Sequence, residues 1–540
     1  MMRKVLLVVT IALMTVNSYG QMGEWTWMNG SDSANSSGYF DQTFGMFDSL
    51  NSPDPLYEPC EWTDLNGNFW LFSGIGGNGL QNSLWEFNPN INQWALIKAA
   101  QRNGVYGTFR VPAPNNNPSQ RGLGVPTWVD TAGDLWLFGG QGFDVNGVQG
   151  ILNDLWRYNI ASNEWTWMSG SDTINNIGSY GTILVSSASN NPPGRSETNA
   201  SWTDNNNNLW LFGGCNDSTS NLDEMWKYDL SINEWTWMKG PDSLNYNGVY
   251  GIVGVPDSLN NPCSRYCYSK WKDSNGNLWL FGGFDNYVQT HNDLWRFNPV
   301  SNEWTWMKGP NIGNDTGTIG SKCSTSITSN PKARYENRAC WTLPNDNFVF
   351  FGGGFDQSST YYNDLWNYNV SNNSWTLMSG STLLNQAGNY GTKTVSNPNN
   401  MPPNRYGSVG WKDNMGNLWM FGGGSNNGSL NDMWRFVPDT NCINSGIPQS
   451  TPNSPAISLY PNPNNGTFTL SYHLSNCQLS SVNCQLKITD VTGRTLYSLY
   501  ISNLEGQETL TLPLSSGIYF WQMQNDAAII GNGKVVIIRN

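Results

Sequence analysis

A repeat of about 70 residues constrains this 540-residue chain more than any other feature of its sequence. One tryptophan recurs after a polar pair at spacings of 71, 70, 69, 71 and 68 residues; it stands at Trp85, Trp156, Trp226, Trp295, Trp366 and Trp434. A period this regular indicates one supersecondary unit copied six times. Length alone would suggest three or four domains, but the repeat favours one array of similar units.

Each unit contains four segments, a to d, that have the pattern of short β-strands. Segment a holds a tryptophan, b is an apolar run ending in a Gly pair such as Leu135 to Gly140, c reads Asp-Leu-Trp-Arg-Tyr, and d reads Glu-Trp-Thr-Trp-Met or a relative. Turns such as Asp64-Leu-Asn-Gly-Asn68 join a to b and favour hairpins. A calcium loop is the alternative for these turns, but they lack the distal bidentate carboxylate.

Six four-stranded sheets that are apolar on both faces must pack against one another, and radial stacking achieves this without long open edges. We therefore predict an all-β fold in which residues 21–440 form a six-bladed β-propeller. A d segment at Trp25 precedes the first a segment, and the last unit stops after its c segment at Trp434. The N-terminal strand is therefore expected to complete the sixth blade.

The Gly pair, the spaced tryptophan and the Asp-Leu-Trp-x-Tyr segment resemble kelch repeats of the galactose oxidase and attractin-like type, over about residues 22 to 440. The period exceeds the usual kelch period of about 50 because the connections from d to a are long. These connections share a Gly-x-Tyr-Gly motif, seen at Gly104 to Gly107 and at Gly178 to Gly181.

The composition changes after Cys442. A Ser/Pro/Asn-rich linker at residues 441–455 leads into a strand-rich module at residues 456–540, expected to be a small β-sandwich. Its motifs Leu459-Tyr-Pro-Asn-Pro463, Ile488 to Arg494, Leu514 to Phe520 and Gly533 to Ile538 resemble a type IX secretion sorting domain, type A. The resemblance implies a partner in the type IX secretion machinery, and a propeller that is secreted or held at the cell surface.

The N-terminal residues 1–20 have the pattern of a secretory signal peptide: a basic start, an apolar run from Val5 to Val16 and small residues before Gln21. No later segment is long and apolar enough to predict a membrane span. Nine cysteines would then lie in a compartment that permits disulfides, with Cys477 and Cys484 as one candidate pair and scattered buried thiols as the alternative. The net charge of −13 disfavours nucleic acid as a partner.

Functional residues are expected on the face that carries the long b–c and d–a connections, called here the long-loop face. Near the start of segment a, five units place an arginine: Arg121, Arg195, Arg265, Arg334 and Arg405. These arginines either ring the channel mouth and bind acidic glycans, or tie each connection to its own blade, which we favour. Tyrosines follow three of them, at Tyr266, Tyr335 and Tyr406, and are candidates for stacking on sugar rings.

The b–c connections offer carboxylates at Asp144, Asp285 and Asp356. They serve either as loop caps, which we favour, or as the paired acids of a glycoside hydrolase. A copper-radical oxidase like galactose oxidase is disfavoured because the chain has two histidines, His291 and His473, and His473 lies in the sorting module. The Ser-x-Asp-x-Gly-x-x-Trp box of sialidases is not apparent.

We therefore predict a monomeric, secreted or cell-surface binding propeller that recognises a glycan or an extracellular protein through its long-loop face, without catalysis, cofactor or metal. The alternative from another class is a polysaccharide hydrolase or lyase with its site at the channel mouth. A third interpretation is a structural component of a matrix or of an adhesion.

Overall fold

The computed structural model describes residues 22–41, 43–77, 79–198, 200–216, 220–355, 359–443, 456–460, 464–473, 484–491, 493–501, 503, 505–524 and 529–539. The chain divides into two compact units, Met1–Gly446 and Ile447–Asn540. The predicted signal peptide lies outside the described residues, as does the predicted linker from residue 444 onward.

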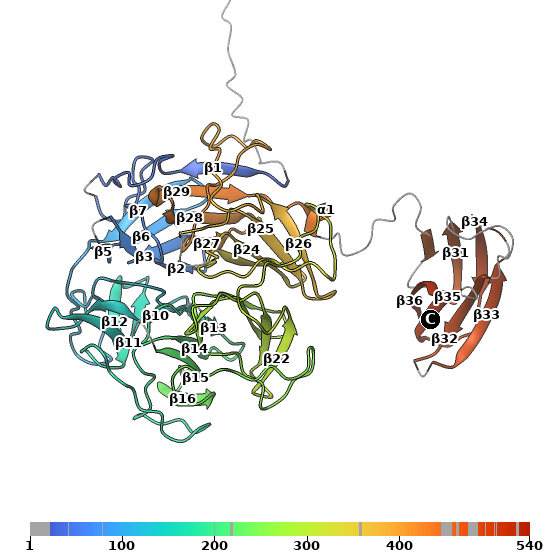
Figure 1. Cartoon of the computed structure of the whole chain (residues 1–540), viewed down its shortest axis with the longest axis horizontal. Helices are drawn as coiled ribbons and strands as arrows, with labels where there is room; N and C mark the ends of the chain where they lie inside the picture. The colour runs from blue at the N-terminus through green and yellow to red at the C-terminus, as the bar shows by residue number, and fades with distance from the viewer. Residues whose placement is uncertain are drawn as a thin grey trace, which may run out of the picture. The chain divides into compact units, whose positions relative to one another are not determined.

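Six sheets, here the first to sixth sheets, form the N-terminal unit (Figure 1). Five of them have four strands, and the second has a fifth, the short strand β8 (Arg121–Gly122), which also pairs with β10. The first contains β2 (Cys60–Thr63), β3 (Phe69–Phe72), β6 (Leu84–Asn88) and β7 (Gln93–Lys98); the second β9 (Thr127–Val129), β10 (Leu135–Phe143), β11 (Gln149–Asn159) and β12 (Glu164–Ser169); the third β13 (Ser201–Thr203), β14 (Leu209–Cys215), β15 (Asn221–Asp229) and β16 (Glu234–Lys239). The fourth contains β18 (Ser269–Lys272), β19 (Leu278–Phe281), β21 (Leu294–Asn298) and β22 (Glu303–Lys308); the fifth β23 (Cys340–Leu343), β24 (Asn347–Phe351), β25 (Leu365–Asn369) and β26 (Ser374–Ser379); the sixth β27 (Val409–Lys412), β28 (Leu418–Ser425), β29 (Gly428–Phe436) and β1 (Trp25–Asn29).

The six sheets form a closed ring. Their innermost strands contact one another in the cyclic order β2, β9, β13, β18, β23, β27 and back to β2. Six hydrophobic clusters fill the spaces between neighbouring sheets, and in one of them Phe69 and Trp94 of the first sheet pack with Trp411 and Phe421 of the sixth. Burial of both faces of every sheet is therefore achieved by the ring, and the predicted all-β propeller is confirmed.

The N-terminal strand completes the sixth sheet, as predicted. β1 pairs antiparallel with β29, with Trp25 opposite Phe436 and Trp27 opposite Trp434, and the two strands run side by side in Figure 1. Trp25 is only 1% exposed and packs edge-on against Phe351 of the fifth sheet. Both ends of the propeller sequence are thus held in one sheet, which resists fraying.

The recurring turns and Gly pairs have local structural roles. In the first a–b turn, Asp64 Oδ1 accepts hydrogen bonds from the amides of Asn66 and Asn68, and its Oδ2 accepts one from the Trp70 indole, so the carboxylate caps the turn. Gly139 and Gly140 have φ of 60° and 91°, and a Cβ on Gly139 would lie 2.7 Å from the carbonyl oxygen of Leu152. This close approach explains why glycine recurs at the end of the b strands.

The long d–a connections cover the outer edges of the sheets. An asparagine side chain in the connection donates a hydrogen bond to the carbonyl of the tryptophan in an outermost strand, from Asn116 to Trp165 at 3.0 Å and from Asn190 to Trp235 at 3.0 Å. Asn51, Asn260 and Asn400 make the same contact in three further sheets. Covered edges do not invite pairing with another chain.

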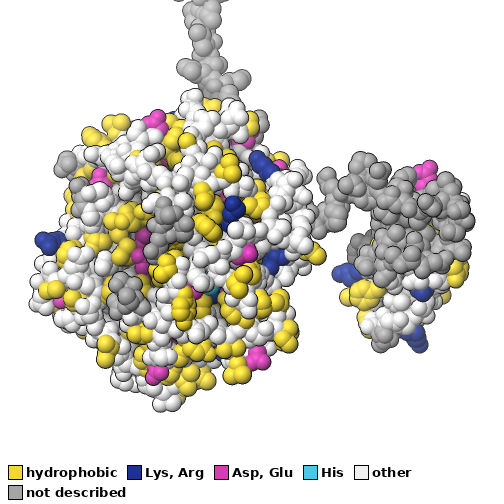
Figure 2. Space-filling model, in the orientation of Figure 1, with side chains coloured by type: hydrophobic (Ala, Val, Ile, Leu, Met, Phe, Trp, Pro, Cys, Tyr) yellow, Lys and Arg dark blue, Asp and Glu magenta, His cyan; other side chains and the backbone are white. Residues whose placement is uncertain are grey.

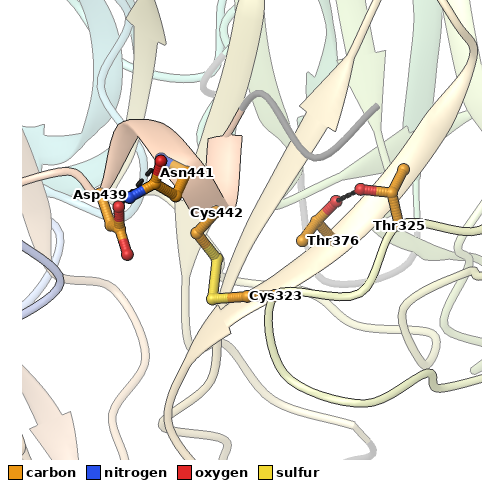
Figure 3. Close-up of a disulfide and its surroundings, with 6 residues drawn as sticks. All are labelled: Cys323, Thr325, Thr376, Asp439, Asn441 and Cys442. Atoms are coloured by element: carbon orange, nitrogen blue, oxygen red, sulfur yellow. Dashed lines mark hydrogen bonds between the residues drawn. A yellow bond between two sulfur atoms is a disulfide. The ribbon is translucent and has the colours of Figure 1, made fainter. Parts of the chain in front are cut away.

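A disulfide fixes the end of the propeller. The short helix α1 (Thr440–Ile443) carries Cys442, which is bonded to Cys323 of a d–a connection (Figure 3). Asp439 accepts a hydrogen bond from the Asn441 amide in the same turn. Of the candidate pair Cys477 and Cys484, Cys477 lies outside the described residues.

The C-terminal unit is a two-sheet sandwich. One sheet contains β30 (Ala456–Tyr460), β31 (Thr467–His473) and β34 (Glu505–Thr511); the other contains β33 (Thr495–Ile501), β32 (Cys484–Thr489), β35 (Gly517–Gln524) and β36 (Ile529–Ile537). Phe468 and Leu470 of the first sheet share a core with Leu486 and Trp521 of the second. The predicted small β-sandwich is therefore confirmed.

Candidate functional site

The five repeated arginines lie inside the blades. Each is 0% exposed and pairs with the acidic residue that begins segment c of its own unit. The pairs are Arg121–Asp154 (2.8 Å), Arg195–Glu224 (2.6 Å), Arg265–Asp293 (2.5 Å), Arg334–Asp364 (2.7 Å) and Arg405–Asp432 (2.7 Å). Each guanidinium also donates to the carbonyl of the first glycine of the Gly pair, as Arg121 does to Gly139 at 3.0 Å.

The Gly-x-Tyr-Gly motif belongs to the same network. Tyr106 donates its hydroxyl hydrogen bond to Asp154 at 2.8 Å, and the Trp156 indole donates to the same carboxylate. Tyr180, Tyr250 and Tyr390 make the corresponding contact in three other units. These contacts fit the favoured interpretation that the arginines tie each connection to its blade. The alternative, a ring that binds acidic glycans, is disfavoured because each guanidinium is buried and paired with a carboxylate.

The candidate aspartates are loop caps. Asp144 Oδ1 accepts hydrogen bonds from the amides of Asn146 and Val148, and Asp285 Oδ1 accepts them from Tyr287 and Gln289. Asp356 lies outside the described residues. The interpretation of Asp144 and Asp285 as caps is therefore supported by geometry, although Asp285 has a second contact described below.

Six residues from six different units encircle the propeller axis on the long-loop face. They stand two positions after the arginine, or its counterpart Leu56, and are called here the collar: Glu58, Leu123, Glu197, Cys267, Glu336 and Gly407. All six have φ between 53° and 61°, and five backbone hydrogen bonds join them in the order Leu123, Glu197, Cys267, Glu336, Gly407 and Glu58, for example from Glu336 N–H to the Cys267 carbonyl at 2.8 Å. This left-handed geometry is costly for non-glycine residues and is held here by the series of hydrogen bonds.

The collar is acidic and largely buried. Glu58 and Glu336 are 3% and 4% exposed, and one carboxylate oxygen of each has no hydrogen-bond partner among the described residues. Burial and the neighbouring Glu197 raise the pKa of Glu336 to about 8 and hold the pKa of Glu58 well above its usual range. The nearest guanidinium, Arg338, lies 4.0 Å from Glu58. Glu336 therefore holds a proton at neutral pH, and Glu58 keeps its proton at higher pH than an ordinary carboxyl group does.

Tyrosines surround the collar. Tyr57, Tyr266, Tyr335 and Tyr406 each precede a collar residue and are half-buried. The ring centroid of Phe284 lies 5.4 Å from those of both Tyr266 and Tyr335, and the ring centroids of Tyr57 and Tyr406 are 5.5 Å apart. Burial and the neighbouring Glu58 raise the pKa of Tyr57 to about 12, so its hydroxyl remains a hydrogen-bond donor. These four tyrosines are called here the aromatic rim.

The sequence identified three of the four rim tyrosines and missed Tyr57 and every collar acid. The available signal was the repeated Tyr-Glu pair at Tyr57-Glu58 and Tyr335-Glu336, which stands at the same position of two units. At the opposite end of the axis, a cavity of about 250 Å³ is lined by the inner strands, with Glu61, Lys270 and Cys340 in its wall. The face seen in Figure 2 carries few charged side chains, and acidic ones show near its middle.

A second cluster lies within the fourth unit. Nε2 of His291 is 3.0 Å from Oδ2 of Asp285 and 3.9 Å from Sγ of Cys263, and all three side chains are buried. Burial opposes charge on both groups, but Arg265 and His291 outweigh it and lower the pKa of Cys263, and contacts with Asp285 and Cys263 raise the pKa of His291 to about 9. A cavity of about 290 Å³ adjoins the cluster. Of these three residues, Asp285 alone was a candidate site residue from the sequence.

Two family models match parts of this chain, and a solved structure is similar to it. Residues 274–307, which span β19, β21 and most of β22, match the model of the Kelch motif, and residues 458–538 match the secretion system C-terminal sorting domain. A solved structure titled "Structure of YjhT" is 14% identical, with a TM-score of 0.45 over 71% of this chain and 95% of that chain. The sorting domain indicates export by type IX secretion, to the cell surface or beyond. Across the described part of the chain, no helix has the length and apolarity to cross a bilayer.

Proposed function

We propose that this exported propeller, which contains a kelch motif and ends in a secretion sorting domain, binds a neutral or basic extracellular glycan at the mouth of its channel. The observation that carries the proposal is the aromatic rim around buried carboxyl groups. Tyr266 and Tyr406 are half-buried and stand directly before collar residues, so a ligand that lies across the axis meets tyrosines and carboxyl groups together.

The chemistry of the rim and collar suits sugars. The apolar face of a sugar ring packs against an aromatic side chain, and sugar hydroxyls are hydrogen-bond donors for a carboxylate. Glu58, Glu197 and Glu336 bring acidic groups together at the collar, and the chain carries a net charge of −13. None of the six collar residues is basic and able to pair with a carboxylate or sulfate group on a glycan, so the preference is for neutral or amino-substituted sugars.

A glycan array probed with the purified full chain tests this proposal. We expect selective binding to neutral or amino-substituted glycans, lowered about tenfold by Tyr266→Ala and by Tyr406→Ala, since one aromatic contact contributes about 0.5–1.5 kcal/mol beyond its buried area. Tyr39→Ala is the matched control, because Tyr39 is 53% exposed and stands in a connection. Selective binding to acidic glycans, or equal binding by all three variants, would contradict the proposal. Binding to an extracellular protein alone would replace the glycan with a protein partner.

Hydrolysis at the same place is a second candidate, and one observation favours it. Glu58 and Glu336 are buried carboxyl groups with raised pKa values beside a third carboxyl, and such groups can act as general acids. Release of reducing ends from a bound polysaccharide, abolished by Glu336→Gln, would establish turnover. Binding without release would leave the propeller as a binding protein.

A further inference from the structure

Three side chains of different chemistry converge in the fourth unit. Cys263 comes from the end of a d–a connection, Asp285 from β20 (Phe284–Asp285) and His291 from the loop before β21. The thiol sulfur, one carboxylate oxygen and an imidazole nitrogen all lie within 4.8 Å of one another. The cluster is separate from the collar, which belongs to the propeller axis.

The repeat itself shows that the fold does not need this combination. The position of His291, two residues before the acid of strand c, is occupied by Leu152, Leu222, Tyr362 and Leu430 in other units. The position of Cys263, two residues before the arginine, is occupied by Ser119, Pro193, Lys332 and Pro403. A residue that serves the repeat recurs in it, whereas Cys263 and His291 occur together in one unit alone.

The polar atoms of these three side chains are incompletely hydrogen-bonded. Asp285 Oδ2 and Cys263 Sγ both face Nε2 of His291, and a proton on that nitrogen can be donated to only one of them at full strength. Nδ1 of His291 is buried and has no hydrogen-bond partner among the described residues. A cation between the three donor atoms would bond to all of them.

We infer that Cys263, Asp285 and His291 bind a divalent transition-metal ion, of which Zn²⁺ fits the donors best. A thiolate, an imidazole nitrogen and a carboxylate are the ligands that zinc takes in proteins, with bonds of about 2.0–2.3 Å. Nε2 of His291 lies 3.0 Å from Asp285 Oδ2 and 3.9 Å from Cys263 Sγ. Two ligand atoms bound to one tetrahedral zinc ion are separated by distances of this size. The thiolate in this set also selects against Mg²⁺ and Ca²⁺, which prefer oxygen ligands.

Neighbouring groups hold the three ligands in place. Arg265 donates a hydrogen bond from Nη2 to Cys263 Sγ at 3.1 Å, which stabilises the thiolate form that binds metal. Asp285 is fixed through Oδ1 by the Tyr287 and Gln289 amides, so Oδ2 is directed to the cluster. Such supporting contacts are typical of metal centres.

Three protein ligands leave one tetrahedral position for an exogenous ligand. The adjoining cavity of about 290 Å³ has Tyr250 and Tyr287 in its wall and gives room for a water or a small anion. Zinc sites with an open fourth position are the reactive kind, whereas four protein ligands make a structural site. The inferred centre is therefore of the open kind.

Cobalt(II) titration of the full-length chain, after dialysis against a chelator, tests the inference. We expect about one equivalent to bind, with a thiolate-to-cobalt charge-transfer band that Zn²⁺ abolishes by displacement. Cys263→Ser should remove the band, and His291→Leu should weaken binding at least about tenfold. Both replacements place in the fourth unit a residue that another unit already has at that position, namely Ser119 and Leu152, so folding is expected to persist and is checked by thermal unfolding.

A matched control separates this site from the collar, where Glu197, Cys267 and Glu336 form another group of possible ligands. Cys267→Gly copies Gly407 of the sixth unit and should leave the cobalt band unchanged. Persistence of the band in Cys263→Ser, its loss in Cys267→Gly, or the absence of stoichiometric binding by the parent would each overturn the inference.

Discussion

Replacing Glu336 with glutamine should stabilise the propeller at alkaline pH and change little at acidic pH. Glu336 is 4% exposed, and burial together with Glu197 raises its pKa to about 8 from an ordinary value of 4.5. Between these two values the folded protein holds a proton on Glu336 that the unfolded chain has released. Stability therefore falls as the pH rises from about 4.5 to about 8, and the loss is complete above the folded-state pKa.

The magnitude follows from the size of the shift. One pKa unit corresponds to 1.36 kcal/mol, so the full shift of Glu336 corresponds to an upper limit of about 5 kcal/mol at alkaline pH. This shift already includes the attraction of Arg338; relaxation and water entry around the ionised carboxylate lower the real cost, so we expect a gain of about 2–5 kcal/mol for Glu336→Gln. Per-residue unfolding entropies imply about 1 °C per kcal/mol for a propeller of this size, hence about 2–5 °C.

Thermal unfolding of parent and Glu336→Gln at about pH 5 and about pH 9 measures this difference. Other groups that titrate in the same range contribute equally to variant and parent, so their contributions cancel in the difference. Asp223 is one of them, because burial and the neighbouring Glu224 raise its pKa to about 8. Glu303→Gln on the outermost strand β22 is the control for a lost carboxylate outside the collar. Two results would refute the assignment of Glu336 as a buried acid. One is a difference in unfolding midpoint between variant and parent that is the same at both pH values; the other is a variant with a lower midpoint than the parent at about pH 9.

Three further changes test the architecture by thermal unfolding. Asp364→Asn leaves the buried guanidinium of Arg334 without its carboxylate and should cost about 3–5 kcal/mol, and an unchanged midpoint would contradict the network. Cys323→Ser opens a disulfide that spans 119 residues and should cost about 2–5 kcal/mol, with the parent alone responding to reductant. Trp25→Ala should cost about 3–5 kcal/mol because its indole fills the space between the fifth and sixth sheets, whereas a loss below about 1 kcal/mol would argue against closure by β1.

The sequence by itself determined the fold of both units. Alternating apolar strands, Asp-x-Asn-Gly-Asn turns and Gly pairs are local signals, and their six-fold repetition made the ring predictable before any contact was known. The position of Trp25 before the first complete unit was enough to predict that β1 closes the sixth sheet. The sorting module could be predicted in the same way, because its motifs are contiguous in the chain.

The charge balance around the axis was decided by the tertiary structure. Each repeated arginine and its acid are 27 to 33 residues apart and meet only when strands a and c of one unit are packed together. The sequence showed both residues of every pair but not that they neutralise each other. What had resembled a basic ring is therefore an internal network, and the titratable side chains of the collar are three carboxyl groups and a thiol.

The collar and the Cys263–Asp285–His291 cluster also depend on the closed fold. Glu58 and Glu336 are separated by most of the propeller sequence and become neighbours because ring closure brings every unit to a common axis. Cys263 and His291 are 28 residues apart, and the segment between them includes four strands, β17 (Arg265–Tyr266), β18, β19 and β20. Local pattern specifies strands and turns, whereas the approach of distant side chains is set by packing, and for this reason both sites emerge only in the folded protein.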